Sequence, residues 1–199
     1  LHDCGKVATP PHIVDKSTKL ETIFDRINLI KTRMELLKKD AEINFLKRKL
    51  KQINDLSFDE QYKKDIEKID SDMEFLEKCN IGGEFMDPSS QSRVISIGNK
   101  KVSIFGKKQN FLSKEEVQNL NITKGTLLPD EREIINDHIV ITIEMLEQLP
   151  YPKHLKNVPE FAGGHHEKMD GTGYPKGLDS KQMSTQAKIM AIADIYEAL

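Results

Sequence analysis

Apolar residues in the first half of the chain recur at alternating spacings of four and three. One series consists of Ile23, Ile27, Ile30, Met34, Leu37 and Ala41. This spacing is typical of a heptad seam and predicts a long helix. The phase slips near residue 44, and we expect the seam to resume with Leu46, Leu50 and Ile53.

A second seam follows a break at residues 55–57. It consists of Phe58, Tyr62, Ile66, Ile69, Met73 and Leu76. Two such seams joined by a short break predict an antiparallel helical hairpin, similar to a coiled coil. The outer face mixes charges of both signs and includes the run Lys47, Arg48 and Lys49. Such a run is typical of a solvated helix face, and anion binding is the alternative.

Breaks and helices alternate in the rest of the chain. Gly82, Gly83 and the Pro-Ser-Ser of residues 88–90 predict the end of helical structure. Residues 93–105 alternate apolar and polar side chains around Gly98 and Asn99, which predicts a small β-hairpin. A helix is expected from Pro129 to about residue 149, because Pro suits the first helical position.

Two further helices are expected near the end of the chain. One should hold the pair His165 and His166, and the last should run from about Met183 or Ser184 onward. Together these patterns predict a mainly α protein.

The composition limits the kinds of partner. The chain has 199 residues, 37% of them hydrophobic and 31% charged, which allows one domain with a core and a long solvated element. A net charge of -2 gives no field that favours polymeric nucleic acid or a membrane surface, so we expect neither.

Two features indicate the setting of the protein. Two cysteines and the lack of an apolar run of 18 residues favour a reducing, cytoplasmic location. The chain begins at Leu1 and stops at Leu199 within a helical pattern, so we expect it to be part of a larger protein.

Two polar residues fall on predicted buried helix faces. His138 shares a stripe with Ile134, Ile141 and Met145, and Asp194 lies in a stripe with Ala187, Met190 or Ala191, and Ala198. A single buried histidine is usually structural. An unpaired buried carboxylate is costly, so we expect a cation or a metal beside Asp194.

Two adjacent pairs add candidate metal ligands, namely His2 with Asp3 and His165 with His166. Neighbours on a helix point about 100° apart, so two metal ions suit such pairs better than one. Imidazole and carboxylate ligands without thiolates fit Mn, Fe, Co, Ni or Zn, and a metal pair suits phosphodiester hydrolysis. Lys6 follows Asp3 by three residues, where its ammonium would hold a phosphate oxygen or simply face solvent.

The loop at residues 167–175 contains Gly171, Gly173 and Tyr174. Glycines let the backbone approach a ligand closely, and an aromatic ring can stack on a base. Alone the loop would be an ordinary turn, but beside a histidine pair it is a candidate substrate wall.

These residues resemble a known family. His2-Asp3-Cys4-Gly5-Lys6 is similar to the His-Asp-hydrophobic-Gly-Lys motif of the HD-GYP family, although Cys4 replaces the usual aliphatic residue. Residues 165–175 match the motif that names the family, His138 falls where the family has its middle histidine, and residues 194–199 look like its final ligand helix. The resemblance covers roughly residues 1–20 and 124–199.

The resemblance implies an HD-type helical bundle that hydrolyses cyclic di-GMP to pGpG or GMP. It implies two or three divalent metal ions, commonly iron or manganese, held by His2, Asp3, His138, His165, His166 and Asp194. Lys6 would contact phosphate and act with Asp3 in catalysis, Gly173 and Tyr174 would line the cleft, and Glu167 and Asp170 would support the ligands. The family has further His and Glu ligands upstream of the first motif, and arginines beyond the last one.

The chain therefore divides into a first part of the HD-GYP domain at residues 1–20, an insertion at 21–123, and a second part at 124–199. The insertion is a stabilising addition, an interface for a homodimer or another partner, or a gate over the cleft. Two other functions remain open: hydrolysis of another cyclic dinucleotide, and a signalling module that binds nucleotide or a partner without turnover.

Overall fold

The computed structural model describes residues 1–51, 57–83 and 85–197. The chain is mainly α, as the sequence predicts, with one small antiparallel sheet in the described part. It folds as two compact units, Lys16–Leu128 and a unit made of Leu1–Asp15 with Pro129–Leu199. No helix among the described residues has the length and apolar character needed to span a membrane.

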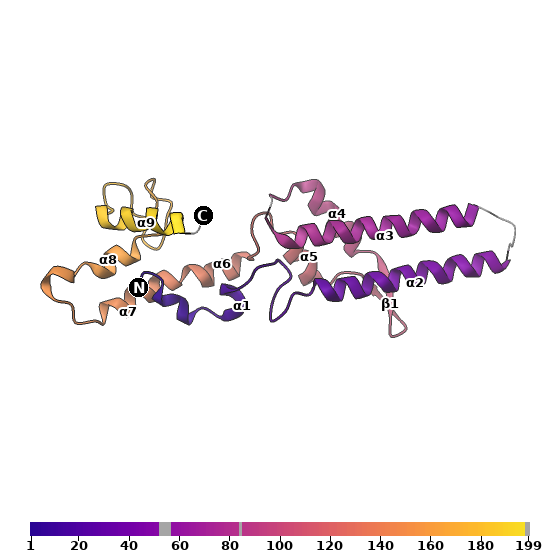
Figure 1. Ribbon diagram of the computed structural model, residues 1–199, viewed down its shortest axis with the longest axis horizontal. Helices are drawn as coiled ribbons and strands as arrows, with labels where there is room; N and C mark the ends of the chain where they lie inside the picture. Colours follow the sequence, from indigo (N-terminus) through magenta and orange to yellow (C-terminus); the bar gives the residue numbers. More distant parts are fainter. Residues whose placement is uncertain (52–56, 84, 198–199) are drawn as a thin grey trace. The chain divides into compact units, whose positions relative to one another are not determined.

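The predicted helical hairpin is confirmed in the unit Lys16–Leu128. Helix α2 (Ile27–Lys51) and helix α3 (Ser57–Ile81) lie side by side and run in opposite directions (Figure 1). Ile27, Ile30 and Met34 are buried, as the first seam predicts. Ile23 lies before the helix and is 94% exposed, so the buried seam begins at Ile27, four residues later than predicted.

The predicted resumption of the seam is wrong for Leu46 and Leu50. Both face solvent, and Leu50 is 81% exposed. Phe45 takes the inward position instead and stacks on Tyr62, with ring centroids 4.7 Å apart. The slip near residue 44 therefore shifts the contact by one residue. Ile53 and most of the predicted break lie outside the described residues.

The predicted β-hairpin exists but lies further along the chain. Residues 93–98 belong to helix α4 (Pro88–Gly98), and the strands are β1 (Lys101–Ile104) and β2 (Lys107–Asn110). The Pro-Ser-Ser segment starts this helix, because the Asp87 carboxylate accepts hydrogen bonds from the backbone N–H groups of Ser89 and Ser90. Val94 and Ile97 are buried three residues apart, a spacing that fits a helix better than a strand.

The core of this unit joins the base of the hairpin to helices α4 and α5 (Lys114–Leu120). It contains Leu20, Ile30, Met34, Leu76, Val94, Phe111 and Leu120. Two charged pairings stabilise polar groups buried beside it. Arg33 binds both oxygens of Glu116, with N–O distances of 3.0 and 2.6 Å, and the Lys19 ammonium donates to the carbonyls of Leu120 and Ile122.

The other unit is built from short helices. They are η1 (Cys4–Ala8), α1 (Pro11–Val14), α6 (Pro129–Asn136), α7 (His138–Glu147), η2 (Lys153–Leu155), α8 (Val158–Gly163) and α9 (Thr185–Glu197). Helix α9 is close to the predicted last helix. The single helix predicted from Pro129 is interrupted at Asp137, which separates α6 from α7.

The buried face of α7 differs from the predicted stripe. His138 is buried as predicted, but its buried neighbours are Ile139, Thr142 and Leu146. Ile134 and Met145 are exposed. In the last helix Ala187 is buried and Asp194 is half-buried, while Ala198 lies outside the described residues.

Glycines allow the helices of this unit to pack closely. The Gly5 N–H donates to the Thr142 hydroxyl at 2.9 Å, which fixes η1 against α7. A β-carbon at Gly5 would lie 2.0 Å from the carbonyl oxygen of His138. A β-carbon at Gly163 would lie 2.5 Å from the Ile143 side chain, and one at Gly164 would lie 2.7 Å from the β-carbon of Ala187. These glycines therefore let α8 lie close against α7 and α9.

Candidate metal centre

The candidate ligands come from the ends of several elements. His2 and Asp3 directly precede η1, His138 is the first residue of α7, and Asp194 lies on α9. The pair His165 and His166 occupies the turn after α8. The predicted helix around this pair is therefore wrong, because α8 ends at Gly163.

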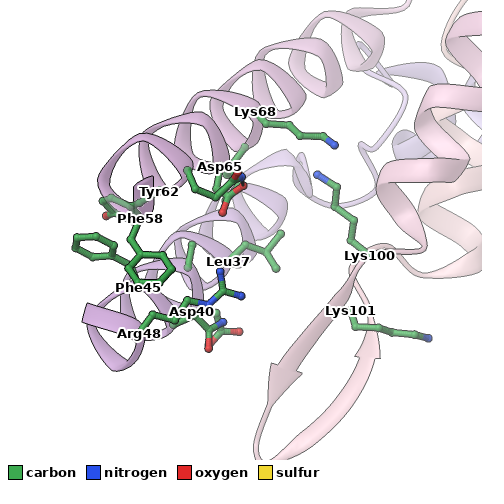
Figure 2. Close-up of a pocket in the computed structure, with 14 residues that line it drawn as sticks. Leu37, Asp40, Phe45, Arg48, Phe58, Tyr62, Asp65, Lys68, Lys100 and Lys101 are labelled. Atoms are coloured by element: carbon green, nitrogen blue, oxygen red, sulfur yellow. Dashed lines mark hydrogen bonds between the residues drawn. The ribbon is translucent and has the colours of Figure 1, made fainter. Parts of the chain in front are cut away.

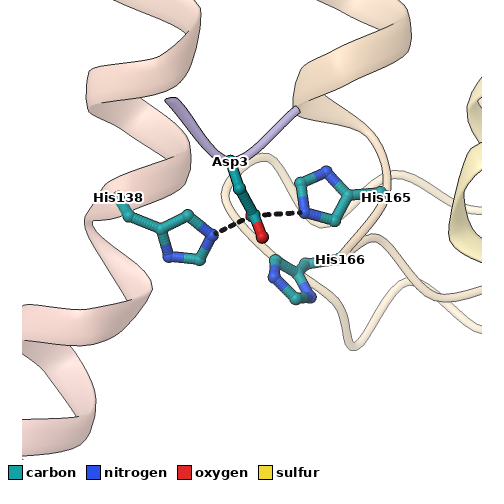
Figure 3. Close-up of side chains that lie close together, drawn as sticks. All are labelled: Asp3, His138, His165 and His166. Carbon is teal, nitrogen blue, oxygen red and sulfur yellow. Dashed lines mark ion pairs between the residues drawn. The ribbon is translucent and has the colours of Figure 1, made fainter. Parts of the chain in front are cut away.

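One group of ligand atoms surrounds Asp3. Figure 3 shows its carboxylate between His138 and His165, with His166 alongside. Asp3 Oδ1 lies 3.2 Å from His138 Nε2 and 3.5 Å from His165 Nε2. One ligand atom from each of these four residues lies within 4.8 Å of the others, which is close enough to hold a metal ion.

A second group consists of His2, His165 and Asp194. His2 Nε2 lies 3.4 Å from Asp194 Oδ1 and 3.6 Å from Asp3 Oδ2. The two oxygens of Asp3 thus face different histidines. The structure brings together all six ligands predicted from the sequence, in two groups that share His165.

Hydrogen bonds at the far side of two imidazole rings fix how they present their nitrogens. His138 Nδ1 lies at the carbonyl of Ile135, and His165 Nδ1 is 2.6 Å from the carbonyl of Ala162. A carbonyl only accepts, so each Nδ1 carries the proton and each Nε2 keeps a free lone pair. This is the tautomer that a metal ligand requires.

Three buried atoms of the cluster lack a hydrogen-bond partner. They are Asp3 Oδ1, His138 Nε2 and His165 Nε2. Buried polar atoms are nearly always satisfied, because an unsatisfied one costs about 1–3 kcal/mol. All three orphaned atoms are acceptors that converge on one place, so a bound cation would satisfy them together. The residues fit a metal ion.

The electrostatics of the cluster keep its ligands in their metal-binding forms. Burial, with the neighbouring His165 and His138, lowers the pKa of His166 to about 4. Burial also lowers the pKa of His165. Although burial opposes it, the hydrogen bond and charge of Lys6 hold the pKa of Asp3 below its ordinary value. At neutral pH the imidazoles of His165 and His166 are therefore neutral and the Asp3 carboxylate is ionised.

The stability of the metal-free chain is expected to fall as the pH drops from about 6.5 toward 4. The pKa of His166 is about 4 in the folded chain and 6.5 ordinarily, so the unfolded state binds more protons in this range. Urea unfolding with a chelator present at several pH values measures this slope. His166→Gln should flatten it, whereas removal of the exposed imidazole in His154→Gln should not. An unchanged slope in His166→Gln would contradict the assignment.

Two of the three residues predicted to contact substrate, Lys6 and Tyr174, lie beside the cluster. Lys6 Nζ is 2.6 Å from Asp3 Oδ2, so its ammonium is at the ligand group. The Tyr174 ring stacks on His166, with centroids 4.9 Å apart and an angle of 18° between the planes. Their contact with a substrate stays a prediction.

The predicted supporting residues act on the loop that carries Tyr174. Glu167 is buried, and its two oxygens accept hydrogen bonds from the backbone N–H groups of Lys176 and Leu178 at 2.7 and 2.8 Å. Asp170 is exposed and accepts from the backbone and hydroxyl of Thr172. Glu167 thus folds the loop back beneath the histidine pair, and Asp170 forms a local turn.

Gly173→Ala is expected to lower the free energy of unfolding by about 2 kcal/mol, because an added methyl group overfills a packed site. A β-carbon at Gly173 would lie 2.3 Å from the backbone nitrogen of Lys168 and 2.5 Å from Glu167 Cα. Backbone cannot move aside as a side chain can. Urea unfolding tests this, with Lys181→Ala at an exposed site of the same segment as control. Equal stability of both variants would show that the loop tolerates the added methyl group.

Sequence reasoning missed the groups that hold the ligands in place. Thr142 anchors Gly5, and the carbonyls of Ile135 and Ala162 orient two histidines. Thr142 falls on the buried face of α7 at a spacing of four from His138, which is a usable signal. Backbone carbonyls have no signal in the side-chain pattern.

Comparison with known proteins finds a family with a similar sequence. Residues 115–199 match the model of the HD domain family. This part of the chain is similar to HD domains. The resemblance to the HD-GYP family is thereby confirmed for helices α6 to α9. His2 and Asp3 lie outside the matched residues, yet the fold brings them to the candidate ligands His138, His165, His166 and Asp194.

Curated relatives match about two fifths of the chain. The chain is 41% identical over 86 residues to a probable cyclic di-GMP phosphodiesterase of Vibrio cholerae, covering 41% of this chain and 20% of that protein. It is 37% identical over 75 residues to a cyclic di-GMP phosphodiesterase of Thermotoga maritima, covering 38% and 20%. A 3′3′-cGAMP-specific phosphodiesterase of V. cholerae is also 37% identical over 75 residues, covering 38% and 16%.

These matches span a fifth or less of each relative's own length. No solved structure matches the chain.

Proposed function

We propose that this chain carries the catalytic centre of a metal-dependent phosphodiesterase that hydrolyses cyclic di-GMP to pGpG or GMP. The observation that carries the proposal is the convergence of three orphaned buried acceptors, Asp3 Oδ1, His138 Nε2 and His165 Nε2. The names of the relatives from V. cholerae and T. maritima support the substrate.

The metal ions proposed are two or three divalent ions, iron or manganese, with zinc, cobalt and nickel as alternatives. Asp3, His138, His165 and His166 would hold one ion, and His2 with Asp194 would contribute to a second. The ligand set offers imidazole and carboxylate without thiolate, which suits these metals. When bound, such ions lower the pKa of an attacking water and neutralise charge on a phosphoryl group.

The chain's own residues would position the substrate. Lys6 carries an ammonium at the edge of the cluster, where it is paired with Asp3 and would turn to a phosphate oxygen. Gly173 and Tyr174 would form the wall of the cleft, because the loop brings Tyr174 onto His166. Glu167 holds this wall through two backbone hydrogen bonds, and Asp170 would support it from its outer turn. Hydrolysis to pGpG breaks one P–O ester bond and consumes one water, whose oxygen goes to phosphorus and one of whose protons goes to the released ribose oxygen. Hydrolysis onward to two GMP breaks a second P–O ester bond and consumes a second water in the same way.

A second candidate substrate is 3′3′-cGAMP, because a similar relative is named for it. The residues proposed above contact metal and phosphate, and those contacts are the same for both cyclic dinucleotides. A signalling module that binds nucleotide or a partner without turnover is the candidate from another class. The lack of polymeric nucleic acid and membrane partners, a homodimer or protein partner through the insertion, and the cytoplasmic location stay predictions.

The test is hydrolysis by the chain loaded with Fe²⁺ or Mn²⁺ under reducing conditions. Cyclic di-GMP, 3′3′-cGAMP and cyclic di-AMP are incubated separately, products are separated by chromatography, and metal content is measured on the same sample. We expect hydrolysis of cyclic di-GMP that disappears in His165→Ala. Turnover of 3′3′-cGAMP alone would favour the second substrate, and a metal-loaded chain without any turnover would contradict the enzymatic proposal.

A further inference from the structure

A hollow of about 430 Å³ opens between the two long helices at the point where their seam loses its phase (Figure 2). Ala41 and Asn44 of α2, with Gln61 and Asp65 of α3, line it. A coiled-coil seam is normally filled by large apolar side chains. Small and polar residues leave it open here, and the volume falls within the range of about 300–1,000 Å³ found for small-ligand pockets.

Aromatic rings form one end of the hollow. Phe45 comes from α2, and Phe58 and Tyr62 come from α3. Phe45 and Tyr62 already stack, with an angle of 17° between their planes, so flat faces are held in place by the hairpin itself. Such rings bind flat aromatic ligands by stacking.

Basic side chains also line the hollow. Arg48, Lys68, Lys100 and Lys101 face two acidic lining residues, Asp40 and Asp65, which leaves a net charge of +2. Figure 2 shows the ammonium groups of Lys68 and Lys100 extending toward each other at the end opposite the rings. Lys100 is paired with the buried Asp72 at 2.5 Å and is therefore held in position.

Arg48 and Lys68 are the cations of α2 and α3 that line the hollow. Lys31, Lys38 and Lys49 form ion pairs with the opposite helix. Arg48 and Lys68 have no ion pair with any residue that the structure describes, although both line the hollow. Positive charge without an ion-pair partner among the described residues, in the same hollow as stacked rings, favours a ligand that carries both an aromatic ring and an anionic group.

We propose that this hollow binds a nucleoside monophosphate. The base stacks at the aromatic end, and the phosphate lies between Arg48 and Lys68, which supply charge-assisted hydrogen bonds. Asp40 and Asp65 accept hydrogen bonds from the ribose hydroxyls or base amino groups, because an ionised carboxylate is only an acceptor. The inserted unit would then be a nucleotide-binding module with a site of its own, and the inference does not rest on the phosphodiesterase activity.

The test is titration calorimetry of the whole chain carrying His165→Ala, so that nucleotide binding at the metal centre is removed. The probes are 5′-AMP, adenosine and inorganic phosphate. We expect one site for 5′-AMP, with adenosine and phosphate each binding at least about tenfold more weakly, because each lacks half of the contacts. Equal affinity for phosphate and 5′-AMP would overturn the role of the rings.

Variants of the hairpin locate the site. Arg48→Gln and Lys68→Gln should each weaken 5′-AMP binding at least about tenfold, which is the size expected for loss of a charged hydrogen bond. Lys47→Gln is the matched control, because Lys47 is an exposed neighbour on α2 that does not line the hollow. Helical content by circular dichroism confirms that each variant is folded. No 5′-AMP binding at millimolar concentration, or equal weakening by all three variants, would overturn the proposal.

Discussion

The Asp3→Asn variant is expected to lose its bound metal ions and to lose hydrolytic activity by more than about 100-fold. The expected loss exceeds the roughly 10–100-fold effect of removing a group that merely supports a metal ligand. Asp3 Oδ1 faces His138 and His165, and Asp3 Oδ2 faces His2. An amide keeps the shape of the side chain but removes the negative charge that faces His2, His138 and His165.

Metal content by elemental analysis and the initial rate with cyclic di-GMP measure this effect. Asp137→Asn is the matched control, because Asp137 is an exposed carboxylate beside His138 and makes no capping hydrogen bond. We expect it to keep both metal and rate. If Asp3→Asn retains a full complement of metal, Asp3 is not a ligand, and the cluster must bind its ions through the histidines and Asp194.

Gly5→Ala is expected to lower the free energy of unfolding of its unit by about 3 kcal/mol, at the upper end of the usual cost of overpacking. The added β-carbon would lie 2.0 Å from the His138 carbonyl oxygen and 2.7 Å from the Thr142 backbone nitrogen. Both atoms belong to the backbone of α7, so η1 must move away. Because His2 and Asp3 directly precede η1, metal affinity should fall together with stability.

Urea unfolding and metal titration of the same sample test this coupling. Gly83→Ala is the control, since a β-carbon there meets nothing within 4 Å. Unchanged stability in Gly5→Ala would show that η1 does not depend on its close approach to α7. Reduced stability with unchanged metal affinity would show that the position of Asp3 does not depend on η1.

The spacing of apolar residues predicted the buried residues correctly where a helix buries one continuous face, as α2 does over its first turns. The seam of Ile27, Ile30 and Met34 is buried because α3 covers one face of α2 along these turns. The prediction for Leu46 and Leu50 is wrong because the helix continues while the inward side passes to Phe45. Where apolar residues are sparse, as near residue 45, spacings of three and four are compatible with either of two neighbouring faces of the helix, and the sequence does not say which face is buried.

The alternation of apolar and polar residues gave a wrong prediction where helix capping and tertiary packing outweighed it. Residues 93–98 alternate like a strand, but Asp87 caps the start of α4, and Val94 and Ile97 pack into the core as a helix. The strands form instead where Phe105 and Gly106, both with positive φ, provide the turn between them. The histidine pair lies in a turn for a similarly local reason, since α8 ends at Gly163 and Gly164 follows it directly.

The sequence by itself predicted the mainly α fold with its helical hairpin, the six candidate imidazole and carboxylate ligands, and the loop that carries Tyr174. Residue type and spacing are local properties, and they are sufficient for those predictions. Only the tertiary structure decided that His2 and Asp3 meet the other four candidate ligands, that His138 and His165 turn their Nε2 atoms inward, and that the seam opens into a basic hollow. Gly5 and Thr142 are 137 positions apart, and the close approach of η1 to α7 that joins them depends on packing that no local pattern contains.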